Sequence, residues 1–144
     1  MSLSLRPATT ADAEALLRWR NDPQTRAASH TPDLVPAEQH MSWFATVLAD
    51  PQRRLWIAEL ADGQTVGSIR ADWTGGEYLL SWMLAPEARG KGLGTSLLQA
   101  AVKMLPGQIM RAEIKDENVA SWRMAEAAGF LCVKNEDGVR HYLR

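Results

Sequence analysis

The chain has 144 residues, a length typical of one compact domain, so we expect a single domain over residues 1–144. Its 16 Lys and Arg residues nearly balance its 17 Asp and Glu residues, which argues against a nucleic-acid partner. One cysteine excludes an internal disulfide, and three widely spaced histidines predict no metal site. Without a long apolar run or an apolar leader segment, we expect a cytoplasmic protein with no membrane span.

The first third of the chain predicts one strand and two helices. Leu3–Arg6 alternates like a strand, and Thr9–Asp12 opens a helix that stops near Pro23. We expect an irregular segment over Thr25–Pro36. A second helix follows Pro36, with apolar side chains at helical spacing at Met41, Phe44, Val47 and Leu48.

The centre of the chain predicts a hairpin followed by a buried strand. Arg54–Leu60 and Thr65–Trp73 flank an Ala-Asp-Gly turn and read as paired strands. Tyr78–Leu84 is almost continuously apolar, which favours a strand covered on both faces.

The last third alternates helices and strands. A helix follows Gly94, Ile109–Lys115 reads as a strand, and Asn118–Ala128 reads as a helix stopped by Gly129. Leu131–Val133 and Val139–Leu143 predict a closing hairpin, with Cys132 expected in the core. The mixture predicts an α+β or α/β domain with three layers.

A glycine-rich loop, Arg89–Gly94, joins the Tyr78–Leu84 strand to the next helix. The first turn of a helix has unpaired N–H groups and partial positive charge, which together suit a phosphate or pyrophosphate. Gly90, Gly92 and Gly94 lack Cβ atoms that would block a ligand, and Arg89 and Lys91 add positive charge. The spacing matches neither a P-loop nor the dinucleotide-binding fingerprint.

Two motifs in this order resemble the GNAT superfamily of N-acetyltransferases. Arg89-x-x-Gly92-x-Gly94 is similar to the superfamily's acyl-CoA pyrophosphate loop. The stretch from Asn118 to Gly129-Phe130 is similar to its second signature, an Asn that opens a helix ending in Gly-Phe. The order of elements agrees with the superfamily over nearly the whole chain.

The resemblance implies a three-layer fold with a mixed, mostly antiparallel sheet of about seven strands, splayed strands 4 and 5, and about four helices. Acetyl-CoA, the expected co-substrate, would lie in the gap between Tyr78–Leu84 and Ile109–Lys115. Met83 and Leu84 would bind its pantetheine arm through the main chain, and Asn118 would contact the same arm. The Leu84 N–H would polarise the thioester carbonyl. The pyrophosphate would be held by Gly90, Lys91, Gly92, Leu93, Gly94 and Thr95, with Arg89 beside it.

An alkylamine is almost wholly protonated at neutral pH, so a base or a water relay must remove a proton before attack. Glu77, at the mouth of the central strand, is the first candidate, followed by Asp72 and Glu113. His30 and His40 are of a type that titrates near neutral pH, but they fall near the expected acceptor region and read as substrate contacts or surface residues.

The expected general acid is missing. Many relatives place a tyrosine four residues before Gly-Phe, whereas this chain has Ala125. Ser121 is a nearby hydroxyl that could protonate the thiolate. Alternatively, the thiolate leaves unaided near the helix start at Asn118.

The acceptor is predicted only by analogy. Arg20, Arg26, His40 and Trp43 lie in segments that resemble relatives acting on nucleotide-linked amino sugars, and would bind that substrate. The missing tyrosine is shared with relatives that acetylate ribosomal-protein N-termini. A non-catalytic acyl-CoA sensor stays open as an alternative, and the resemblance makes a homodimer possible.

Overall fold

The computed structural model describes residues 3–144. Its strands are β1 (Leu3–Pro7), β2 (Arg53–Leu60), β3 (Thr65–Trp73), β4 (Tyr78–Leu84), β5 (Met110–Lys115), β6 (Leu131–Glu136) and β7 (Val139–Leu143). Its α-helices are α1 (Ala13–Asn21), α2 (Pro23–Ala28), α3 (Ala37–Ala49), α4 (Leu93–Met104) and α5 (Val119–Ala127). Short 3-10 turns cover Thr10–Asp12 and Pro86–Ala88.

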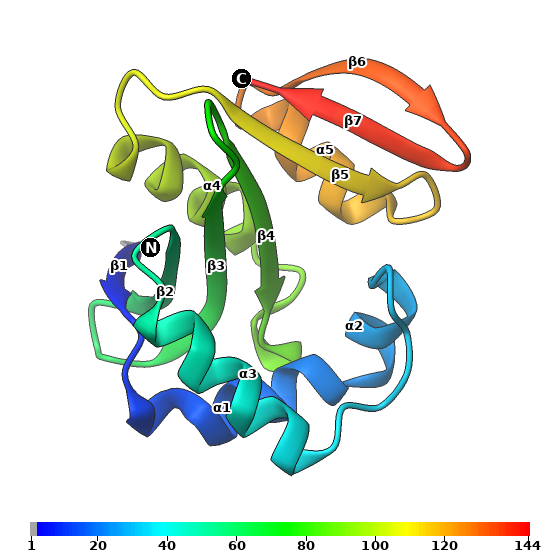
Figure 1. Cartoon of the computed structure of the whole chain (residues 1–144). Coiled ribbons are helices and arrows are strands. Elements are labelled where there is room, and N and C mark those ends of the chain that lie inside the picture. Colours follow the sequence, from blue (N-terminus) through cyan, green and yellow to red (C-terminus); the bar gives the residue numbers. More distant parts are fainter. Residues whose placement is uncertain (1–2) are drawn as a thin grey trace.

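The strands form a seven-stranded sheet in the order β1-β2-β3-β4-β5-β7-β6. Each neighbouring pair is antiparallel except β4 and β5, which are parallel. Helices α1 and α3 cover one face of the β1–β4 part, and α4 packs on β1 and β3 from the opposite face (Figure 1). The predicted mixed, mostly antiparallel three-layer fold is confirmed. None of the helices within residues 3–144 is long and apolar enough to cross a membrane.

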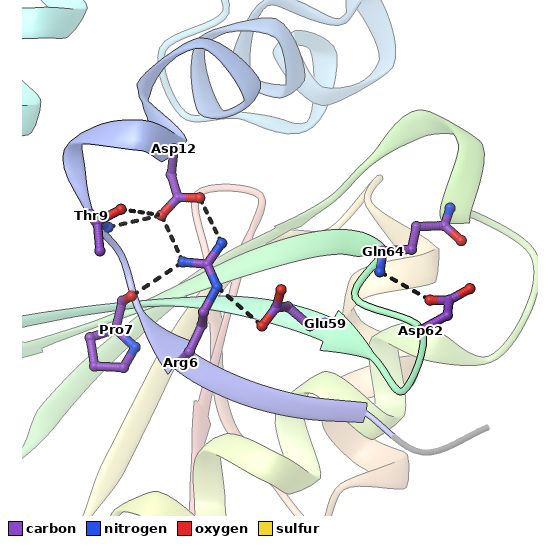
Figure 2. A network of polar contacts seen from close by, with 7 residues as sticks. All are labelled: Arg6, Pro7, Thr9, Asp12, Glu59, Asp62 and Gln64. Carbon is purple, nitrogen blue, oxygen red and sulfur yellow. Dashed lines mark hydrogen bonds and ion pairs between the residues drawn. The ribbon is translucent and has the colours of Figure 1, made fainter.

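A buried carboxylate ties the first strand to the first helix (Figure 2). The Asp12 carboxylate accepts two hydrogen bonds of 2.8 Å from the Arg6 guanidinium and one of 2.8 Å from the Thr9 N–H. The Arg6 Nε also lies 3.1 Å from Glu59 on β2. The Arg6 guanidinium and the Thr9 N–H hold the pKa of Asp12 below its ordinary value, because they stabilise the charged form.

The segment after Asn21 corrects the prediction of irregular structure from Thr25, because its first part is helix α2. Asp22 caps this helix by accepting hydrogen bonds of 3.1 Å from the N–H groups of Gln24 and Thr25. Pro23 occupies the first helical position, where its missing N–H costs nothing. The Asp22-Pro23 pair therefore marks both the end of α1 and the start of α2.

The buried face of α3 is rotated from the predicted one. Phe44 and Val47 are buried as expected, but Met41 and Leu48 are exposed. His40 takes a core position instead and is only 3% exposed, with its ring stacked on Phe44. The buried face of α3 thus includes a histidine, which the spacing of the hydrophobic residues alone did not predict.

Two expectations about burial are wrong. Cys132 is exposed, because every residue of the edge strand β6 is exposed, and that strand runs to Glu136 rather than Val133. In β4 only Leu80 and Leu84 are buried, and Ser81 is exposed. The apolar character of β4 therefore does not reflect packing on both faces, and part of its surface lines a cavity.

Candidate functional site

The central feature of the site is a break in the sheet between β4 and β5. The two strands pair only at Tyr78 with Met110 and at Leu79 with Arg111. Beyond these residues they diverge, as Figure 1 shows, so the carboxyl half of β4 has no neighbour on its β5 side. The predicted splaying of strands 4 and 5 is confirmed.

The alternation of hydrogen bonds decides which β4 groups face this gap. The Ala85 N–H donates to Val66 on the β3 side, whereas the Tyr78 N–H donates to Ile109 on the β5 side. In an antiparallel pair, bonded and non-bonded residues alternate, so Met83 directs its main-chain groups toward β3. Trp82 and Leu84 direct theirs into the gap. The main-chain groups of Leu84 thus face the gap, as its predicted role requires, whereas those of Met83 face β3.

A cavity of about 400 Å³, here called the main cleft, fills the gap. It brings together nine residues singled out from the sequence, contributed by α1, the segment after α2, β4, the glycine-rich loop, β5 and the start of α5: Arg20, His30, Met83, Leu84, Arg89, Gly90, Glu113, Asn118 and Ser121. Residues predicted to hold a pantetheine arm thus lie along one continuous cavity.

The glycine-rich loop turns at Gly90 and Gly92, which have φ values of 76° and 74° and nothing within 4 Å of an added Cβ. Gly92 is the N-cap of α4, and no described side chain caps that helix. Gly94 serves a different purpose, because an added Cβ would lie 2.3 Å from the Met124 sulfur of α5. The space beside Gly94, which was expected to be open to a ligand, is therefore occupied by a side chain of α5.

The rest of the predicted loop set lies around the start of α4. Lys91 is exposed, Leu93 is buried in the core and Thr95 is half-buried. None of these side chains lines the main cleft. Any contact that they make with an anion would therefore come from the helix start itself, where backbone N–H groups point outward.

The Arg89 side chain is occupied by α2. Its Nη2 lies 2.7 Å from Asp22 Oδ2 and donates to the Thr25 hydroxyl at 2.8 Å, and its Nη1 donates to Gln24 at 3.2 Å. Arg89 lowers the pKa of Asp22, because the guanidinium favours the carboxylate. The loop predicted to bind phosphate is thus tied to the helix that borders the opposite side of the main cleft.

A second cavity of about 420 Å³, here called the side cavity, adjoins the main cleft. The two cavities share Arg20, Ser81, Trp82 and Met83 in their linings. His40 and Trp43, both predicted to bind substrate, line the side cavity, although the His40 Nε2 lies 3.0 Å from the Ala13 carbonyl oxygen. Arg26, the fourth predicted residue, lines neither cavity, and its Nε donates to the Pro32 carbonyl.

The three carboxylates considered as bases occupy different positions. Glu77 lies 3.2 Å from Arg111 and lines neither cavity. Asp72 lies 3.0 Å from Arg70 and also lines neither. Glu113 lines the main cleft and lies 3.1 Å from Arg111. Of the three, only Glu113 therefore lines the main cleft, and Glu77, the first choice from the sequence, lies outside both cavities.

His30 is also brought into the main cleft. Its Nε2 lies 3.0 Å from the main-chain oxygen of Glu113 on β5. Because a carbonyl oxygen only accepts hydrogen bonds, Nε2 must carry the proton, and Nδ1 is the nitrogen that can take one up. Sequence reasoning had treated His30 and His40 alike, and only their surroundings separate them.

The position of the missing tyrosine is buried. Ala125 is fully enclosed, and no hydroxyl reaches the cleft from it. Ser121, one turn earlier, does line the main cleft. Asn118 caps α5 through its side-chain oxygen, which accepts from the Ser121 N–H at 3.4 Å.

Trp82, Ser81 and Arg70 are site residues that the sequence did not single out. The signal for Trp82 was available, since alternate residues of a strand share a side and Leu84 was already chosen. Arg70 lies on β3, opposite Ser81 of β4, and lines the side cavity. Nothing in the local sequence marks it.

The sequence matches the acetyltransferase (GNAT) domain family over residues 2–131. A curated relative from Pseudomonas aeruginosa, an L-methionine sulfoximine/L-methionine sulfone acetyltransferase, is 32% identical over 142 residues, covering 90% of this chain and 81% of its own.

Two solved structures resemble the fold over 99% of this chain and 94% of their own. The spermidine N-acetyltransferase of Vibrio cholerae in complex with CoA and spermine has a TM-score of 0.87 at 16% identity. An aminoglycoside acetyltransferase in complex with coenzyme A and kanamycin has a TM-score of 0.80 at 25% identity. With the family match over most of its length and the open β4–β5 edge, the chain belongs to the GNAT family of acetyltransferases.

Proposed function

We propose that the protein transfers an acetyl group from acetyl-CoA to a primary amine by direct attack of the amine on the thioester. The observation that carries this proposal is the break between β4 and β5, which leaves the main-chain groups of Trp82 and Leu84 facing the main cleft. A second cavity opens onto the same point, so two substrates can meet there. The aminoglycoside acetyltransferase bound to coenzyme A supports the same co-substrate.

The residues present fit coenzyme A. Its pyrophosphate would be held by the uncapped N–H groups at the start of α4, where Gly90 and Gly92 leave open space. Its pantetheine arm would run along the gap-facing edge of β4 and contact Asn118. Acetyl-CoA would supply the acetyl group as a thioester.

The chemistry would take place where the two cavities join. A main-chain N–H of Trp82 or Leu84 would donate a hydrogen bond to the thioester oxygen and stabilise the charge that develops on it. Of the two, Trp82 lines both cavities and Leu84 only the main cleft, which favours Trp82.

Proton removal from the amine would fall to His30 or Glu113, which line the main cleft. Either the Nδ1 of His30 or a Glu113 carboxylate oxygen would accept the proton, directly or through water. Ser121 would donate a proton to the departing thiolate, unless the thiolate leaves unaided. Glu77 stays a weaker candidate because it lines neither cavity.

The acceptor would be a primary amine whose amino group reaches the junction beside Trp43 and Arg20. A nucleotide-linked amino sugar is one such acceptor, and the N-terminus of a protein is another. The 32%-identical relative, named for methionine sulfoximine and methionine sulfone, adds free amino acids as a third class.

A thiol-release assay with acetyl-CoA tests the proposal. We expect coenzyme A to appear only when an amine is added, and the acetylated amine to be found in equal amount by mass spectrometry. His30→Gln and Glu113→Gln variants should identify the base, because the variant that lacks it should lose 10²- to 10⁴-fold in kcat.

Binding of coenzyme A in calorimetry without turnover on any amine would instead indicate a non-catalytic acyl-CoA sensor. Absence of binding as well would contradict the placement of the co-substrate in the main cleft.

A further inference from the structure

Arg20 is a cation at the junction of the two cavities. It lies in the last turn of α1 and lines both the main cleft and the side cavity. Its Nη2 donates to the Thr31 carbonyl oxygen, whereas its Nη1 is buried and has no hydrogen-bond partner within residues 3–144. A buried donor without a partner is destabilising, and more so when it is charged, so this group needs an acceptor.

The side cavity as a whole is positively charged. Arg70 is the other arginine in its lining, and it is compensated by Asp72 at 3.0 Å and by the Trp43 ring at 5.4 Å from the guanidinium carbon. Among the described residues, no aspartate or glutamate lines this cavity. Nor does Arg20 form an ion pair with any carboxylate of residues 3–144. The charge of Arg20 is therefore the one left uncompensated.

The surroundings of Arg20 disfavour its charge. Burial and the nearby charge of Arg26 both lower the pKa of Arg20, because each penalises the protonated guanidinium. A bound anion would stabilise the protonated guanidinium and offset both penalties. A polycation would add to the second and would meet no carboxylate in the side cavity.

We infer that the acceptor carries an anionic group, a carboxylate or a phosphate, which Arg20 binds in the side cavity while the amine lies at the junction. This inference rests on the proposed acetyl transfer and specifies its substrate class. The guanidinium would use its unpartnered Nη1, together with Nε or Nη2, for paired hydrogen bonds to two anion oxygens.

Two classes of amine carry such an anionic group. A free amino acid carries its carboxylate one carbon from the amine, and the methionine sulfoximine/methionine sulfone acetyltransferase is the relative that points to it. A nucleotide-linked amino sugar carries its charge on a diphosphate. Spermine and kanamycin, held by the two structural neighbours, are cationic and lack this feature.

Matched acceptors test the inference on the unmodified protein. Methionine sulfone is compared with its carboxamide, which differs in the carboxylate alone. An amino-sugar nucleotide is compared with the same amino sugar without its diphosphate, and spermine and kanamycin serve as cationic amines. We expect at least one anionic acceptor to exceed its neutral partner by 10- to 100-fold in kcat/KM, the value of a charged hydrogen bond. The pair that responds identifies the source.

Arg20→Gln should abolish that preference by raising the KM for the anionic acceptor 10- to 100-fold, with the KM for acetyl-CoA within about two-fold. Arg20→Lys should recover part of it. Arg18→Gln is the control, since Arg18 lies in the same turn of α1, pairs with Glu87 and lines neither cavity. Equal rates within both pairs, or faster turnover of the cationic amines, would overturn the inference and leave acetyl transfer standing. No turnover with any amine would overturn the proposed function, and the inference with it.

Discussion

At the residue scale, a glycine in β3 determines how closely β4 can approach β3. A Cβ added to Gly67 would lie 2.6 Å from the main-chain oxygen of Met83 and 3.3 Å from Leu84 Cα. Both atoms belong to the β4 backbone, which cannot move away without parting β3 from β4. Gly67 thus allows β3 to pack closely against β4, whose other edge faces the main cleft.

Gly67→Ala should therefore lower the free energy of unfolding by about 2–4 kcal/mol, a cost typical of overpacking against backbone. Gly76→Ala is the matched control, because nothing lies within 4 Å of its added Cβ. Urea denaturation of both variants measures the difference. Equal stability of the two variants would show that β3 and β4 can accommodate a Cβ atom at position 67 without cost.

Gly92 tests the start of α4 as an anion site. Gly92→Glu places a side chain and a negative charge where the pyrophosphate would lie, so we expect loss of acetyl-CoA binding by at least 100-fold in calorimetry. The substitution also strains the backbone, because φ is 74°.

Gly75→Glu controls for that strain, since Gly75 has a φ of 89° and open surroundings in the turn at the other end of β4. It should lose similar stability and keep its binding. If Gly92→Glu bound acetyl-CoA normally, the co-substrate could not lie at the start of α4.

At the element scale, β4 is a strand with one paired and one open edge. The N–H groups of Ser81 and Met83 face β3, and those of Trp82 and Leu84 face the gap. The same strand thereby completes the sheet and offers a main-chain edge to a ligand, as a peptide does when it adds to a sheet.

Amide hydrogen exchange should show this alternation. In the free protein we expect Trp82 and Leu84 to exchange faster than Ser81 and Met83, since their N–H groups lack a strand partner. Saturating coenzyme A should slow exchange at one or both of the open positions and leave Ser81 and Met83 nearly unchanged. Uniform protection along β4 in the free protein would contradict the open edge.

The connection between β1 and α1 makes stability depend on pH. The pKa of Asp12 is held below its ordinary value, chiefly by Arg6. A carboxyl whose pKa is lowered in the folded state contributes stability that is complete above the unfolded pKa of about 4 and lost as the pH falls through the folded value. Stability should therefore decline below about pH 4.

Asp12→Asn removes this contribution. We expect a loss of about 1 kcal/mol at pH 7, kept modest because Arg6 is partly exposed, and a shallower decline between pH 5 and pH 2. Thermal unfolding across that range measures both. Asp33→Asn, at an exposed position, should follow the unmodified protein, and a steep decline in Asp12→Asn would contradict the assignment.

At the scale of the whole molecule, the sheet consists of two parts that meet at two residue pairs. β1–β4 lie on one side of the break and β5–β7 on the other, joined through β4 and β5 and through the contact of α4 with α5. The main cleft is lined by residues of β4 and of β5, so a bound co-substrate would touch both parts.

Coenzyme A should consequently stabilise the protein as a whole. At a concentration 100 times its dissociation constant, we expect about 2.7 kcal/mol of added stability and a rise of several degrees in the unfolding midpoint. Gly92→Glu should show no such rise. A midpoint that coenzyme A leaves unchanged would contradict binding across the junction.

The sequence by itself determined the order of elements, the glycine-rich turn before α4 and the Asn118 helix start, because these depend on local backbone preferences and on spacing. It also located β4, whose apolar run is plain. It did not reveal α2 beyond Pro23, because the capping role of Asp22 is easily read as a stop.

Only the tertiary structure decided which side chains share a cavity. Arg20, Arg70 and Trp82 come from three elements and meet only when the sheet closes over α1 and α3. The tertiary structure likewise places His30 in the cleft and His40 in the core. It also places Cys132 on an edge strand, where it is exposed. Charge compensation and burial depend on neighbours distant in the chain, so local pattern carries no information about them.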